Sequence, residues 1–176
     1  KLMFVSHSSA IAAFPGGFGT MDELFEVLTL MQTGKSHILP IVLMEGEGGL
    51  YWDQWRDYIQ ALLASGWISP EDVHLTYIAA DIDAAVEHIQ TFYKRYHSSR
   101  YVDDTFVLRL QTPLTAEHIE EMNQKFARAI ASGNIYATQP FPEETDCLDL
   151  PRIAFHHTRR DFALIRMMID HINALP

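Results

Sequence analysis

Three glycines, a threonine and a glutamate form the stretch of this sequence best suited to chemistry. The stretch reads Phe14-Pro15-Gly16-Gly17-Phe18-Gly19-Thr20-Met21-Asp22-Glu23. Glycines can adopt positive φ and bring their N–H groups close to a ligand, and the N-terminus of a following helix adds partial positive charge. The residues expected to hold a phosphate in this way are Gly16, Gly17, Gly19 and Thr20. Glu23 then places a carboxylate beside the phosphate.

The neighbouring residues predict a strand, a turn and a helix that position this stretch. Residues 10–14 are a continuous apolar run of strand length, and Pro15 ends it because proline has no N–H for a strand ladder. A helix is expected from Thr20 to Thr33, with Gly34 as its C-cap. Its core-facing residues are expected to be Met21, Leu24, Phe25, Leu28 and Met31. Open α/β sheets bind ligands where such strands end.

Other interpretations of the glycine-rich stretch also have to be weighed. Thr20 and Glu23 fit a capping box, in which Thr20 caps the helix and Glu23 bonds back to its N–H; spacing alone favours this structural role. A dinucleotide fingerprint would need glycine at Asp22, and a P-loop ending at Gly34-Lys35-Ser36 would need glycine at Thr29. Neither fits. Glu26 is either a ribose contact or a solvated charge.

Pro15 to Thr20, followed by Glu23, resembles the PGGxGTxxE signature of the LOG ("Lonely guy") family of nucleotide phosphoribohydrolases, which are often labelled lysine decarboxylases. The resemblance is specific through about Gly34 and extends to about Tyr96. It implies that Glu23 is the catalytic glutamate and that the glycines and Thr20 hold a 5′-phosphate. The family's catalytic arginine would fall one place before Lys1, so an N-terminal part of the fold is expected to precede this sequence.

Composition narrows the class of protein. The net charge of −10 argues against a nucleic-acid polymer as partner, because neutralising a phosphate backbone needs excess Lys and Arg. A hydrophobic content of 48% supports a packed core. The single cysteine, Cys147, excludes an internal disulfide and fits a reducing cytoplasm. No apolar run approaches membrane-spanning length, and no secretory signal is present, so a cytoplasmic protein without membrane partners is expected.

Alternating strands and helices up to residue 97 predict a Rossmann-like domain with a doubly wound parallel sheet over residues 1–97. A strand is expected over 38–44, with Pro40 outside the ladder, followed by a loop at 45–49 that is either a site wall or a flexible surface segment. The later elements are a helix over 51–64, a short helix capped by Ser69, a strand over 76–80 and a helix from Asp81 to Tyr96. The inward residues of the last helix are expected to be Ile82, Ala85, Val86, Ile89 and Phe92.

Residues 98–176 predict a small α+β extension. Its expected elements are a strand over 106–110, a helix from Thr115 to Gly133-Asn134, a loop over 138–151, a strand over 152–155 and a helix over 161–173. The last helix carries an apolar stripe that packs either on the extension's sheet or on a second subunit, and its residues are Phe162, Ile165, Met168, Ile169 and Ile172. His156, His157 and His171 do not predict a metal site, because adjacent histidines cannot easily chelate one ion and no acidic partner has ligand spacing.

The leading function is hydrolysis of the N-glycosidic bond of a nucleoside 5′-monophosphate, either a cytokinin riboside monophosphate or an AMP-like nucleotide, to free base and ribose 5-phosphate. No cofactor is expected, and the resemblance implies a homodimer or larger homo-oligomer, with the helix over 51–64 as a candidate interface. The alternative is a non-catalytic nucleotide sensor. Decarboxylation is disfavoured because pyridoxal phosphate needs a Schiff-base lysine. The four lysines, none in a recognisable setting for it, are Lys1, Lys35, Lys94 and Lys125.

Overall fold

Two units make up residues 5–176, the part of the chain that this computed structural model describes. The first unit ends at Thr91, and the second runs from Phe92 to Pro176. The change of composition had predicted the boundary slightly later, near residue 97. Residues 1–4 lie outside the described residues.

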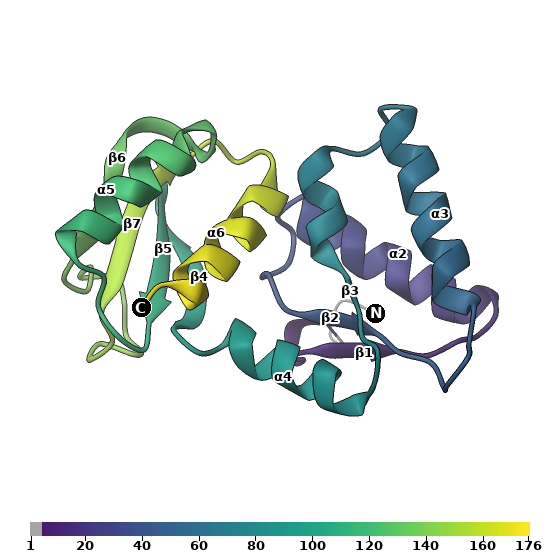
Figure 1. The fold of residues 1–176 in the computed structure, drawn as a ribbon. Helices are drawn as coiled ribbons and strands as arrows, with labels where there is room; N and C mark the ends of the chain where they lie inside the picture. Colours follow the sequence, from purple (N-terminus) through teal and green to yellow (C-terminus); the bar gives the residue numbers. More distant parts are fainter. Residues whose placement is uncertain (1–4) are drawn as a thin grey trace. The chain divides into compact units, whose positions relative to one another are not determined.

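The first unit is built on a parallel sheet, as the sequence predicts (Figure 1). Its strands, in the order β1-β2-β3, are β1 (Ile11–Ala13), β2 (Ile41–Leu43) and β3 (Tyr77–Ile78). The elements between and after them are α2 (Phe18–Gln32), α3 (Tyr51–Ala64), a 3₁₀ helix (Pro70–Leu75) and α4 (Ile82–Phe92). Figure 1 shows α2 and α3 over one face of the sheet and α4 under the other. This arrangement confirms a Rossmann-like α/β unit.

The central strand β2 anchors this unit. Its residues Ile41, Val42 and Leu43 are completely buried, as expected for a parallel strand covered on both faces. The strand begins after Pro40, whose carbonyl accepts a hydrogen bond of 3.0 Å from the Ile11 N–H. Pro40 therefore lies outside the ladder, as predicted, while still holding β1 in register.

Helix α2 confirms the expected core face in part, because Leu24 and Met31 are buried as predicted and Val27 is buried in addition. Its buried residues are Leu24, Val27 and Met31, whereas Phe25 is 37% exposed. The Phe25 ring packs instead against Trp55 of α3, with ring centroids 5.3 Å apart. The residues that face the sheet and the residues that face α3 both repeat at helical spacing. The periodicity alone could not tell these two sides of α2 apart. Gly34, at φ 68°, ends the helix as predicted.

Helix α4 ends at Phe92, four residues before the expected Tyr96. The cause is Asn173, whose side-chain oxygen accepts hydrogen bonds from the N–H groups of Arg95 and Tyr96, and whose amide donates to the Phe92 carbonyl. These contacts stop the helix and start a strand. Two residues expected to face inward are exposed, Ile82 at 70% and Val86 at 46%.

The second unit is an antiparallel sheet with helices, which confirms the predicted α+β class. Its strands, in the order β4-β5-β7-β6, are β4 (Tyr96–Val102), β5 (Thr105–Leu110), β7 (Arg152–His157) and β6 (Ile130–Thr138). The helices are α5 (Ala116–Lys125), which is capped by Thr115 as predicted, and α6 (Phe162–Ala174). The expected apolar stripe of α6 is buried throughout, and α6 lies against β4.

One element of this unit was predicted wrongly. Helix α5 ends at Lys125 rather than at Gly133-Asn134, and both of those residues lie within strand β6. Asn123 explains the difference, because its side-chain oxygen accepts from the Ile135 N–H at 2.7 Å and its amide donates to the Ile135 carbonyl at 3.0 Å. Gly133, at φ 69°, occupies an irregular part of the strand instead of capping a helix.

The buried His157 gives this unit a pH-dependent stability. Burial lowers its pKa to about 4, with Arg159 adding to the effect, and the Tyr101 hydroxyl lies 2.7 Å from Nδ1. Because the pKa of the folded state lies below the ordinary value of about 6.5, the stabilisation is complete above pH 6.5 and is lost as the pH falls towards 4. Between pH 7 and pH 5, we expect the free energy of unfolding to fall by about 2 kcal/mol less in His157→Gln than in the unchanged protein. Urea denaturation at both pH values measures this loss.

The matched control for this prediction is His156→Gln, since His156 is exposed on the same strand. It should lose stability with falling pH as the unchanged protein does. If the free energy of unfolding of His157→Gln fell with pH as steeply as that of the unchanged protein, the prediction would be wrong.

Candidate active site

The glycine turn joins β1 to α2, and α2 begins earlier than expected. Its N-cap is Gly17, in extended conformation at φ −92° and ψ −153°, and no side chain of the described residues caps it. The predicted capping box is therefore wrong: Thr20 lies inside the first turn, and Glu23 is not part of a cap. Glycine is tolerated at this position, and it leaves the first N–H groups of the helix without a side-chain acceptor.

The glycines serve a different purpose from the positive φ expected of them. Among the described glycines, positive φ occurs at Gly34, Gly48, Gly66 and Gly133 and not in the turn. A Cβ on Gly16 would overlap the Thr20 hydroxyl and lie 2.9 Å from its Cβ. At Gly17 and Gly19 a Cβ would meet nothing within 4 Å. Glycine at position 16 thus lets Thr20 pack onto the turn, and the two others keep the backbone open to solvent.

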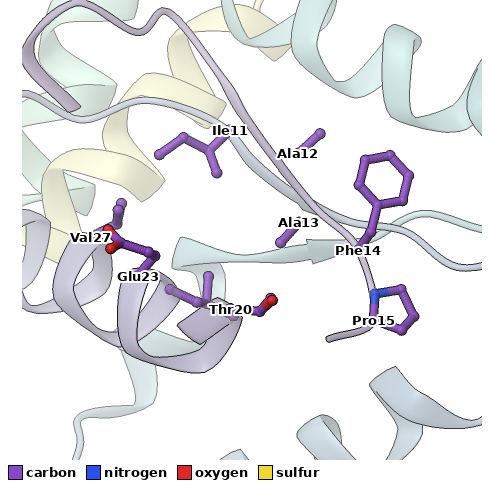
Figure 2. A pocket seen from close by; sticks show the side chains of 9 residues that line it. Ile11, Ala12, Ala13, Phe14, Pro15, Thr20, Glu23 and Val27 are labelled. Atoms are coloured by element: carbon purple, nitrogen blue, oxygen red, sulfur yellow. The ribbon is translucent and has the colours of Figure 1, made fainter. Parts of the chain in front are cut away.

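A pocket of about 600 Å³ lies beside β1 and the first turns of α2 (Figure 2). Its lining residues are Ile11, Ala12, Ala13, Phe14, Pro15, Thr20, Glu23, Leu24 and Val27. Among these described residues, Glu23 is the one ionisable group and Thr20 the one hydroxyl. Glu23 is exposed to solvent, so its carboxylate can meet a ligand that enters the pocket. A carboxylate placed beside a developing positive charge stabilises that charge.

Figure 2 shows how the side chains are arranged around this pocket. Ile11 and Ala13 point towards α2, whereas Phe14 points to the other side, as alternation along a strand requires. Thr20 and Glu23 project from successive turns of α2 because they are three residues apart. The pocket therefore brings together two of the predicted site residues.

The other predicted residues lie nearby but do not line this pocket. Gly16, Gly17 and Gly19 form the turn and the first turn of α2 immediately before Thr20. Glu26 is half-buried one helical turn beyond Glu23, and it is not among the described lining residues. A contact between Glu26 and a ribose stays a prediction.

Two residues that the sequence had not singled out fix the turn from outside. The Tyr51 hydroxyl donates a hydrogen bond of 2.7 Å to the Gly16 carbonyl. The Glu45 carboxylate accepts hydrogen bonds from the N–H groups of Tyr51, at 3.0 Å, and Trp52, at 3.3 Å, and so caps α3. The sequence held no signal for the Tyr51 contact, because its partners are 35 residues apart.

Membership of a family is decided by comparison with known proteins. A family model described as "Possible lysine decarboxylase" matches residues 1–89, just over half of the chain and all of the turn and pocket. The curated relatives that match carry the name LOG. The chain belongs to the LOG family.

Three LOG relatives illustrate the extent of the similarity. The Arabidopsis thaliana cytokinin riboside 5′-monophosphate phosphoribohydrolase LOG1 is 33% identical over 96 residues, 54% of this chain and 44% of the relative. The probable enzyme LOGL9 of Oryza sativa subsp. japonica is 32% identical over 52% of this chain and 39% of its own length. Arabidopsis thaliana LOG3 is 39% identical over 40% of this chain and 31% of its own length. The chain thus spans less than half the length of these LOG relatives.

The described residues also bear on metal binding and on membrane insertion. No group of three or more His, Cys, Asp or Glu side chains among residues 5–176 is arranged to hold a metal ion. His156 is exposed and His157 is buried, so these neighbours lie on opposite faces of β7. In the described part of the chain, every helix is too short or too polar to cross a membrane.

Proposed function

We propose that the intact protein hydrolyses the N-glycosidic bond of a nucleoside 5′-monophosphate and releases the free base and ribose 5-phosphate. The observation that carries the proposal is the placement of Glu23. Among the described residues that line the pocket it is the one ionisable group. It lies one turn after Thr20 and close to the start of α2, which no side chain of the described residues caps. Membership of the LOG family supports it, as do the phosphoribohydrolase names of the relatives.

In this reaction, one group of residues binds the phosphate and another residue acts on the bond that breaks. The N–H groups around Gly17 and Gly19, with the Thr20 hydroxyl, hold the 5′-phosphate and so fix the anomeric carbon. The bond from that carbon to the base nitrogen breaks, and positive charge develops on the ribose. The Glu23 carboxylate stabilises that charge and orients the attacking water, whose oxygen bonds to the carbon. The water gives up one proton to the carboxylate, and the base nitrogen takes up a proton as it leaves, so that water is divided between the ribose and the base.

The names of the relatives and the lining of the pocket support a proposal for the class of substrate. The LOG relatives are named for cytokinin riboside 5′-monophosphates, and we propose such a nucleotide or AMP. The apolar walls, with Ile11, Leu24 and Val27, suit the flat face of a base. We do not propose a decarboxylase, despite the family's description, because no lysine is among the described residues that line the pocket.

We further propose a cytoplasmic homo-oligomer. The surface where α2 meets α3 supports an interface there, because the apolar rings of Phe25 and Tyr58 are 37% and 50% exposed. Sedimentation of a monomer at micromolar concentration would contradict this part of the proposal.

The test of the activity is incubation of the intact protein with AMP, followed by chromatographic detection of products. We expect adenine and ribose 5-phosphate to appear in equal amounts, with adenosine cleaved far more slowly because it lacks the phosphate anchor. Binding of AMP without release of adenine would instead support the nucleotide-sensor function.

A further inference from the structure

Gly16 is held from two sides, and both contacts concern the geometry of the turn. On one side, Thr20 packs against the Gly16 Cα so closely that no Cβ fits between them. On the other, the Gly16 carbonyl accepts the 2.7 Å hydrogen bond from the Tyr51 hydroxyl. The peptide that joins Gly16 to Gly17 is therefore contacted by a residue of α2 on one side and by a residue of α3 on the other.

Tyr51 is itself held in place by its surroundings. Glu45 caps the first turn of α3 through the Tyr51 and Trp52 N–H groups, and its carboxylate lies where a Cβ on Gly49 would be. The Trp52 indole N–H donates to the Met44 carbonyl at 2.9 Å, at the end of β2. The hydroxyl that reaches Gly16 thus projects from a helix tied to the central strand of the sheet.

The orientation of the Gly16–Gly17 peptide matters for anion binding. In a trans peptide, the carbonyl and the following N–H point in opposite directions, so a carbonyl directed at Tyr51 directs the Gly17 N–H away from it. A peptide between two glycines is the one most free to flip, since both residues tolerate either sign of φ. A flip would turn a carbonyl dipole, in place of an N–H, towards the anion.

We propose that Tyr51 is a positioning residue for phosphate binding, because its hydroxyl locks this peptide in the orientation that presents the Gly17 N–H. The inference rests on the function proposed above and adds a residue of α3 to the phosphate site. A donor held ready before the ligand arrives binds more tightly than one that must first be ordered.

The test compares two tyrosine-to-phenylalanine variants of the same helix in the intact protein. Tyr51→Phe removes the hydroxyl that reaches Gly16. Tyr58→Phe makes the same chemical change two turns later, where the ring packs edge-on against Phe25 and the hydroxyl makes no hydrogen bond among the described residues. We expect Tyr51→Phe to raise the Kd for AMP about threefold to tenfold and to leave the Kd for adenosine unchanged. Tyr58→Phe should change neither.

Hydrogen exchange gives a second readout that needs no ligand. Amides of the 14–21 segment should exchange at least about threefold faster in Tyr51→Phe than in Tyr58→Phe. Unchanged AMP affinity together with unchanged exchange would overturn the proposal, and equal weakening of AMP and adenosine would show a merely structural role. If the unaltered protein bound AMP no better than adenosine, the proposed function would fail, while exchange would still decide whether Tyr51 locks the turn.

Discussion

Replacing Glu23 with glutamine is expected to lower the rate of base release from AMP by a factor of about 10² to 10⁴, with nucleotide affinity kept within about tenfold. Glutamine has nearly the shape of glutamate but no charge, so the pocket beside β1 keeps its walls and loses the one ionisable group among its described lining residues. The phosphate anchor, which lies in the turn before Thr20, is untouched. Single-turnover kinetics and equilibrium binding of AMP separate the two effects.

The matched control is Asp22→Asn, which removes the neighbouring negative charge from α2. Asp22 is exposed, as Glu23 is, but it is not among the described residues that line the pocket. Its substitution should leave the rate within about twofold, since a charge outside the pocket acts on the bound nucleotide only through water. Full activity of the Glu23 variant would refute the catalytic assignment, and a loss of affinity without a loss of rate would make Glu23 a binding residue.

The sequence predicted the elements around the site because each is encoded locally. An apolar run ended by Pro15 gives β1, and Gly34 at positive φ ends α2. Thr20 and Glu23 share a face because they are three residues apart on any helix. The start of α2 was less predictable: a glycine and a threonine are both acceptable N-caps, and only the packing of Thr20 onto Gly16 places the cap at Gly17.

Contacts between distant residues account for what the sequence could not predict. Tyr51 reaches the site across 35 positions, and Asn173 ends α4 from about 80 residues away. Asn123 similarly joins α5 to β6. Each acts through one to three side-chain hydrogen bonds, which leave no periodicity in the sequence. The stripe of α6, by contrast, was predicted correctly because burial along a helix does repeat.

A buried ionic cluster of Glu144, Arg109 and Arg152 holds the loop between β6 and β7 in place. The sequence did not predict this cluster. The Glu144 side chain is fully buried and pairs with Arg109 at 2.8 Å and with Arg152 at 2.6 Å. Burial alone would raise the pKa of Glu144, but hydrogen bonds from the Phe141 N–H and from both arginines outweigh it and lower the pKa. Both guanidiniums are nearly inaccessible as well, so the three charges depend on one another.

Glu144→Gln is therefore expected to destabilise the second unit by about 3–5 kcal/mol, because two buried guanidiniums lose the carboxylate between them. The comparison is Asp146→Asn, which removes the other carboxylate on Arg109, one whose side chain is 59% exposed. That variant should destabilise the unit much less, since water screens an exposed pair. Native-state hydrogen exchange in urea, read at the amides of β5 and β7, measures both. Equal losses in the two variants would mean that burial adds nothing to the Glu144 pairs, and the loop would then owe its position to its apolar contacts.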